Sequence, residues 1–154
     1  MSFLNVYSTS GLAGLRADGI LGLAPTNQNT RADLLLDELK KQEVINNRMF
    51  SLFIGENEEP NSITFGDYDL EKYAKSDIYF HNLSSANYWT LPLTKAKLGE
   101  KELKPTVTSL IVDSGTSFLL LPTQDFKEFT QEFDDKYTCK REIWFNNLYA
   151  CTCS

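Results

Sequence analysis

The sequence predicts a mainly β protein with short surface helices. Short apolar runs bounded by turn residues, such as residues 50–55 and 62–66, are typical of strands. Residues 29–46 and 125–136 instead repeat apolar side chains at helical spacing. The 154 residues suffice for one domain with a core, and the 42% apolar content argues against disorder.

The charge balance argues against nucleic-acid binding. The net charge is −6, from 21 acidic and 15 basic residues, whereas neutralising phosphates requires clustered Lys and Arg. No apolar stretch approaches the length of a membrane span, and no signal peptide is visible at the N-terminus. His81 is the single histidine and lies far in sequence from the cysteines, so we expect no metal site and no cofactor.

The N-terminal part is expected to contain two strands. Residues 1–10 alternate apolar and polar side chains. Further on, an Asp-Gly turn leads into the apolar run Ile20-Leu21-Gly22-Leu23. A glycine inside an apolar strand indicates that another backbone passes close by. We therefore expect Ile20, Leu21 and Gly22 to lie in a buried strand.

A helix and a hairpin are expected next. Thr30 is placed to cap a helix over 29–46, with Asp33 three residues later and several leucines on one face. Residues 50–55 and 62–66 flank a polar turn, which predicts two antiparallel strands. Asp67 and Asp69 follow the hairpin without a third ligand at sensible spacing, so a solvated turn is expected there.

The central segment predicts another strand and another hairpin. Residues 78–83 read as a strand, and its end overlaps the triplet Asn82-Leu83-Ser84, an N-glycosylation sequon. Residues 87–93 and 98–103 indicate a hairpin that turns at Gly99. Asn82 is thus a candidate glycosylation site.

The most informative stretch is the one around Asp113. The apolar residues 110–112 predict a buried strand that stops at this carboxylate, and a second apolar run, 118–121, follows the turn. A carboxylate between two buried segments needs partners, and the Gly115 N–H and the Ser114 and Thr116 hydroxyls are adjacent. Such hydrogen bonds shift a carboxyl pKa. The alternative is an Asx-turn that simply closes a loop.

The C-terminal part predicts a helix followed by a disulfide. Three phenylalanines recur at helical spacing within 125–136, which favours core packing, and residues 143–145 suggest a short strand. The cysteines are Cys139, Cys151 and Cys153. The last two are too close to bridge comfortably, so Cys139 is expected to pair with one of them and leave the other over.

The Asp113 stretch resembles the signature of the pepsin-like aspartic proteases, of the pepsin and cathepsin D type. That signature is an apolar strand running into Asp-[Ser/Thr]-Gly-[Thr/Ser]-[Ser/Ala], which Ile111 to Ser117 matches throughout. Three other segments resemble the family in the right order. They are the Asp-Gly-Ile-Leu-Gly-Leu run at 18–23, the hairpin at 50–66 and the Tyr88-Trp89 pair.

The resemblance implies part of a bilobal fold built of acid-protease β-barrel lobes. Residues 1–154 would be a partial peptidase domain. Residues 1–25 would end the N-terminal lobe, 26–75 would supply a helix and the inter-lobe sheet, and 76–154 would form the first half of the C-terminal lobe. The family setting also implies a secreted protein or one of the lysosomal or vacuolar lumen.

The resemblance assigns roles to individual residues. Asp113 would be catalytic, within the active-site turn of Ser114, Gly115, Thr116 and Ser117. Tyr88 and Ile111 would line the substrate cleft. The strand of Ile20, Leu21 and Gly22 would be a scaffold that packs beneath a catalytic turn.

The family's chemistry requires two carboxyl groups that share one proton, and this sequence contains one such turn. We therefore expect an aspartic endopeptidase that acts on peptides or proteins but is inactive alone. Its partner would be a missing N-terminal lobe segment or a second chain. The alternatives are a homodimeric protease that pairs two Asp113 residues, and a non-catalytic protein that binds peptides.

Overall fold

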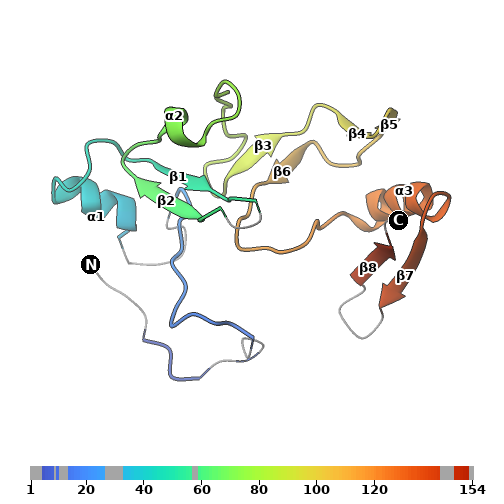
Figure 1. The fold of residues 1–154 in the computed structure, drawn as a ribbon, viewed down its shortest axis with the longest axis horizontal. Helices are drawn as coiled ribbons and strands as arrows, with labels where there is room; N and C mark the ends of the chain where they lie inside the picture. The colour runs from blue at the N-terminus through green and yellow to red at the C-terminus, as the bar shows by residue number, and fades with distance from the viewer. Residues whose placement is uncertain are drawn as a thin grey trace. The chain divides into compact units, whose positions relative to one another are not determined.

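The computed structural model describes residues 5–8, 10, 14–26, 33–56, 59–142 and 148–152. By their contacts the chain divides into two compact units, Met1–Asn82 with Ala86–Tyr88, and Leu83–Ser85 with Trp89–Ser154. The described residues form eight strands and three helices, all of them short except α3 (Figure 1). The prediction of a mainly β chain with short helices is confirmed.

Helix α1, Leu35–Lys41, occupies the middle of the predicted helix 29–46. Asp37 and Glu38 lie in its first turn and two lysines in its last, which suits the helix dipole. The helix ends because Glu43 adopts a positive φ of 57°, a conformation that cannot continue a right-handed helix. The predicted cap Thr30 lies outside the described residues.

Strands β1, Phe50–Phe53, and β2, Ser62–Phe65, form the predicted antiparallel hairpin. Gly66 follows β2 with φ of 85°, and its N–H donates to the Met49 carbonyl at 2.8 Å. A Cβ at this position would lie 2.8 Å from the Cβ of Ile45. Ile45 is the buried apolar side chain of the described residues, 8% exposed. The absence of a side chain at Gly66 lets the backbone lie against Ile45.

Helix α2, Leu70–Tyr73, follows the hairpin directly. The Asp69 carboxylate accepts a hydrogen bond of 3.0 Å from the Lys72 N–H and so caps the helix. The Tyr73 ring stacks on Phe53 of β1, with 4.5 Å between the ring centroids. The acidic turn at 67–69 therefore serves a structural purpose.

The predictions of strands at 20–23 and 78–83 are wrong, and residues 5–8 are not in a strand either. Ile20 and Leu21 are exposed, and a Cβ added to Gly22 would meet no atom within 4 Å. A strand needs a partner backbone for its hydrogen bonds. No strand in the described part of the chain pairs with either segment, so their apolar sequence alone does not produce a ladder.

In the second unit, strand β3, Thr90–Pro92, pairs with β6, Ser109–Ile111, and not with its neighbour in sequence. Strands β4, Ala96–Leu98, and β5, Lys101–Leu103, form the hairpin between them. Gly99 makes its turn with φ of 58°, as the sequence predicts. The predicted pairing of residues 87–93 with 98–103 is wrong, because β3 pairs with β6 and β4 supplies the other strand of the hairpin.

Helix α3, Thr123–Asp134, confirms the predicted C-terminal helix. It packs against the hairpin of β7, Thr138–Glu142, and β8, Leu148–Thr152 (Figure 1). Phe129 and Phe133 lie 4.9 Å apart between ring centroids along the helix, and Phe126 meets Tyr149 of β8 edge to face. The phenylalanine stripe is therefore half-buried, and Phe126 packs it against β8. The predicted strand at 143–145 lies outside the described residues.

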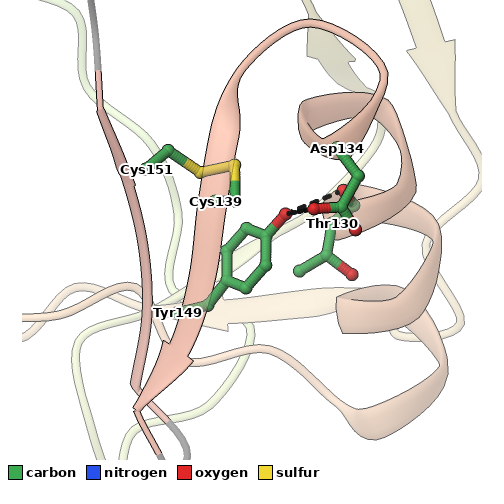
Figure 2. Close-up of a disulfide and its surroundings, with 5 residues drawn as sticks. All are labelled: Thr130, Asp134, Cys139, Tyr149 and Cys151. Carbon is green, nitrogen blue, oxygen red and sulfur yellow. Dashed lines mark hydrogen bonds between the residues drawn. A yellow bond between two sulfur atoms is a disulfide. The ribbon is translucent and has the colours of Figure 1, made fainter.

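A disulfide and a tyrosine fasten this hairpin (Figure 2). Cys139 and Cys151 face each other in the β7–β8 register and form the bridge, while Cys153 lies outside the described residues. The Tyr149 hydroxyl points toward α3, 2.5 Å from the Asp134 carboxylate and 3.1 Å from the Thr130 carbonyl oxygen. Partial burial, then the hydrogen bond to Asp134, raises the pKa of Tyr149 to about 12.

Candidate active site

The candidate site begins where β6 ends. Hydrogen bonds continue the β3–β6 pairing beyond both strands: the Leu93 N–H donates to the Thr108 carbonyl, and the Val112 N–H donates to the Trp89 carbonyl at 2.9 Å. Val112 immediately precedes Asp113. The backbone is thus held in the sheet up to the residue before the carboxylate, and β3 is the element that holds it.

Residues 113–116 form a tight turn that folds back on the Asp113 side chain. The Thr116 N–H donates to the Asp113 carbonyl oxygen at 3.3 Å, which closes the turn. The Gly115 N–H donates to Oδ1 at 2.9 Å, and the Thr116 hydroxyl donates to Oδ2 at 2.6 Å. Each carboxylate oxygen therefore has one donor from the turn, as expected for Gly115 and Thr116, whereas the expected hydrogen bond from the Ser114 hydroxyl is not formed.

These donors stabilise the ionised carboxylate. The Thr116 hydroxyl, and after it the Gly115 N–H, lower the pKa of Asp113 below its ordinary value. Glycine at position 115 keeps the approach open, because a Cβ there would lie 3.2 Å from Oδ1. The turn thus holds an exposed carboxylate that stays ionised into the acidic range and can accept a proton from a bound water.

The prediction that Asp113 lies between two buried apolar segments is wrong. Both segments are exposed, with Ile111 56% and Leu119 71% accessible. β6 belongs to a two-stranded sheet with β3, and no other described helix or strand of its own unit packs extensively on that sheet. Burial of these side chains depends on a covering layer, and not on their own sequence.

The structure brings some of the predicted site residues together. Ile111 lies in β6, two residues before Asp113, and pairs with Thr90 of β3. Ser114 and Gly115 are the central residues of the turn, and Ser117 follows it. Tyr88 and the segment of Ile20, Leu21 and Gly22 belong to the other unit, where all of these side chains but Gly22 are exposed large apolar groups. Their cleft and scaffold roles stay predictions.

Sequence reasoning missed the contribution of β3 to the site. The Trp89 carbonyl anchors the residue before Asp113, although the sequence analysis gives Trp89 no role at the site. The available signal was the apolar run at 87–93, but that run does not reveal which strand it pairs with.

In the described residues, no three His, Cys, Asp and Glu side chains come together as metal ligands. No helix among them is long and apolar enough to cross a bilayer.

Comparison with known proteins decides the family. The family model for eukaryotic aspartyl proteases matches residues 2–154, nearly the whole sequence. The chain belongs to the eukaryotic aspartyl protease family. The resemblance carried by the Asp113 stretch is thereby confirmed.

Curated relatives of this aspartyl protease chain agree. It is 31% identical over 111 residues to a "Probable aspartic-type endopeptidase CTSD" from Arthroderma otae, covering 70% of this chain and 29% of that protein. It is 33% identical over 108 residues to chicken (Gallus gallus) pepsin A, covering 68% of this chain and 29% of that protein. Plasmepsin VIII of Plasmodium berghei is 26% identical over 153 residues, 94% of this chain and 40% of that protein. The chain thus spans well under half the length of these relatives.

Replacing the Thr116 hydroxyl in this aspartyl protease chain should raise the pKa of Asp113. In Thr116→Val the carboxylate loses the donor that contributes most to its low pKa, while the Gly115 N–H remains. The pKa of Asp113 should therefore move up toward its ordinary value without passing it. Titration of the carboxyl carbon resonance by NMR measures the change.

Thr116→Ser is the matched control, since it keeps a hydroxyl at the same position and should leave the pKa low. The pKa of Asp113 is lower in the folded turn than in an unfolded chain. Ionised Asp113 therefore stabilises the turn above the unfolded pKa, and this contribution disappears as the pH falls through the folded pKa. An unchanged pKa in Thr116→Val would show that the hydroxyl does not set it.

Proposed function

We propose that this chain supplies one of the two catalytic carboxylates of an aspartic-type endopeptidase. The observation that carries the proposal is the Asp113 carboxylate, held by the Gly115 N–H and the Thr116 hydroxyl in an exposed turn at the end of β6. The names of the relatives, an aspartic-type endopeptidase and a pepsin, support the same activity. The substrates would be peptides or proteins.

The low pKa of Asp113 keeps this carboxylate ionised at acidic pH, which is the form that can accept a proton. Asp113 would take a proton from a water whose oxygen adds to the peptide carbonyl carbon, while a second carboxyl group protonates the carbonyl oxygen. The two carboxyl groups would lie close together. Two carboxyl groups in close contact cannot both ionise, so they would share one proton and titrate as a pair. Tyr88 and Ile111 would contact the substrate, and Ile20, Leu21 and Gly22 would support the fold.

The second carboxyl group would come from outside this chain. Asp113-Ser114-Gly115 is the single Asp-[Ser/Thr]-Gly triplet in the sequence, since Asp18 is followed directly by glycine. We propose that residues 1–25 end one lobe, 26–75 bridge the lobes and 76–154 belong to the second lobe. The purified chain would then be inactive until a partner segment or chain adds the other Asp turn.

A cleavage assay on the purified chain tests this proposal. A quenched fluorescent peptide is incubated at acidic pH, roughly 3 to 5, over a range of chain concentrations, with and without a pepstatin-type inhibitor. The wild-type chain, Asp113→Asn and the control Asp18→Asn are compared. We expect no inhibitor-sensitive cleavage by any of the three.

Other outcomes would identify the alternatives. Inhibitor-sensitive cleavage that rises with the square of the chain concentration and is lost in Asp113→Asn, but not in Asp18→Asn, would establish a homodimer pairing two Asp113 residues. Cleavage proportional to the chain concentration would contradict the requirement for a partner. Tight peptide binding that survives Asp113→Asn would favour a non-catalytic binding protein.

The disulfide bears on where the chain acts. Structural disulfides such as Cys139–Cys151 form and persist in oxidising compartments. We propose that the protein is secreted or lies in a lysosomal or vacuolar lumen. The test measures how the three cysteines react with a thiol reagent in protein isolated from its own cells without reductant. A reduced Cys139–Cys151 pair would contradict the proposed location.

A further inference from the structure

One motif remains outside the proteolytic site. Asn82-Leu83-Ser84 is the single Asn-X-Ser/Thr triplet in the 154 residues. It lies in an irregular stretch between α2 and β3, and the Asn82 side chain is exposed. Among the described residues nothing forms a hydrogen bond with the Asn82 amide, so this group is free to carry a substituent without losing a contact.

We propose that Asn82 carries an N-linked glycan. The accessible amide is one argument, and the Cys139–Cys151 disulfide is the second, because it indicates an oxidising compartment such as the lumen where N-glycans are attached. The proposal rests on the location of the chain and not on its proteolytic activity.

The third residue of the motif is held very differently from the first. The Ser84 N–H donates to the Thr90 carbonyl oxygen at 2.8 Å, and the Ser84 hydroxyl lies 3.2 Å from the same oxygen. Ser85 also bridges to Thr90, which is buried in β3. The hydroxyl that the transferring enzyme must recognise is therefore engaged in the folded chain. Attachment thus precedes the pairing of Ser84 with β3, while the amide stays outside afterwards.

The attachment chemistry needs a lipid-linked oligosaccharide diphosphate as co-reactant. The Nδ2 of Asn82 forms a bond to C1 of the first N-acetylglucosamine, while the bond from C1 to the diphosphate oxygen breaks. The amide nitrogen gives up one proton, and the lipid diphosphate leaves with the bonding electron pair. No oxidation or reduction takes place.

Asn82 follows closely in sequence on a run of exposed apolar residues. Tyr79 is 75% and Phe80 is 74% exposed, and Ile78 and Leu83 are also accessible. Exposed apolar side chains promote association between chains. A bulky hydrophilic group at Asn82 would keep copies of this segment apart. The glycan would thus limit association between chains.

Translation of the full chain behind a cleavable signal sequence, in the presence of microsomes, tests the proposal. Only chain protected from added protease is scored, so that every scored molecule has reached the lumen. We expect one gel shift in the wild-type chain that an N-glycan amidase removes. The shift should be lost in Asn82→Gln and Ser84→Ala, and kept in Ser84→Thr and in the control Asn5→Gln.

Protected wild-type chain without a shift would overturn the proposal, as would a shift that persists in Asn82→Gln. Neither readout requires the chain to fold, because attachment is scored during translocation. Both are independent of catalysis, so a failed cleavage assay and a failed glycosylation assay would not be confused.

Discussion

Removing the Cys139–Cys151 disulfide should destabilise the C-terminal hairpin by about 3 kcal/mol, because reopening a short loop returns chain entropy to the unfolded state. The bridge joins residues 12 apart on facing positions of β7 and β8. A lone two-stranded hairpin is marginally stable in water. Without the disulfide, the hairpin would depend on the contact of Tyr149 with α3. The measurement compares chemical unfolding of Cys139→Ala/Cys151→Ala, made in a Cys153→Ala background, with that background alone.

The Cys153→Ala background removes the third thiol from both proteins, so that no exchange with Cys139 complicates the comparison. Added reductant should destabilise the background protein and leave the triple variant unchanged. Hydrogen exchange should place the loss in the amides of β7 and β8. Equal unfolding free energies of the two proteins would mean that the disulfide does not stabilise this hairpin.

Replacing Gly66 by alanine should cost the first unit roughly 2 to 4 kcal/mol, the sum of a left-handed backbone and overpacking of a core site. Gly66 has φ of 85°, and the new Cβ would lie 2.8 Å from the Ile45 Cβ. That atom is fixed to the backbone and cannot rotate away. Because Ile45 is the buried apolar residue of the described part, the clash falls on the unit's small core.

Gly99→Ala is the matched control for this prediction. Gly99 also has a positive φ, 58°, but a Cβ there would meet nothing within 4 Å. Its cost should be the backbone term alone, about 1 to 2 kcal/mol. Thermal unfolding of both variants measures the difference, and equal losses would rule out the contact with Ile45 as the cause.

The sequence predicts those elements whose partners lie nearby in the chain. The hairpin of β1 and β2 and the turn at Gly99 follow from local patterns, and so does α3. The segments 20–23 and 78–83 have equally apolar sequences but do not form strands. A strand depends on a second backbone, and nothing within an apolar run specifies where that backbone comes from.

The same distinction applies to the candidate site. Gly115 and Thr116 are predictable partners of Asp113 because they follow within three residues. The support from Trp89 is not predictable, because it depends on the pairing of β3 with β6. For the cysteines, proximity leaves two pairings open, and the β7–β8 register places Cys151 opposite Cys139.

The pairing of β3 with β6 also has a consequence for the order of folding. Among the described strands, the other three sheets join consecutive strands, whereas the hairpin of β4 and β5 lies between β3 and β6. Pairing β3 with β6 closes a longer loop than the local hairpins do, and closing a longer loop costs more entropy. The local hairpins therefore form earlier. The sheet that positions Asp113 is then the last to assemble and among the first to open. An intact β3–β6 ladder, and not the local turn at Asp113, therefore reports that the hairpin of β4 and β5 has already formed.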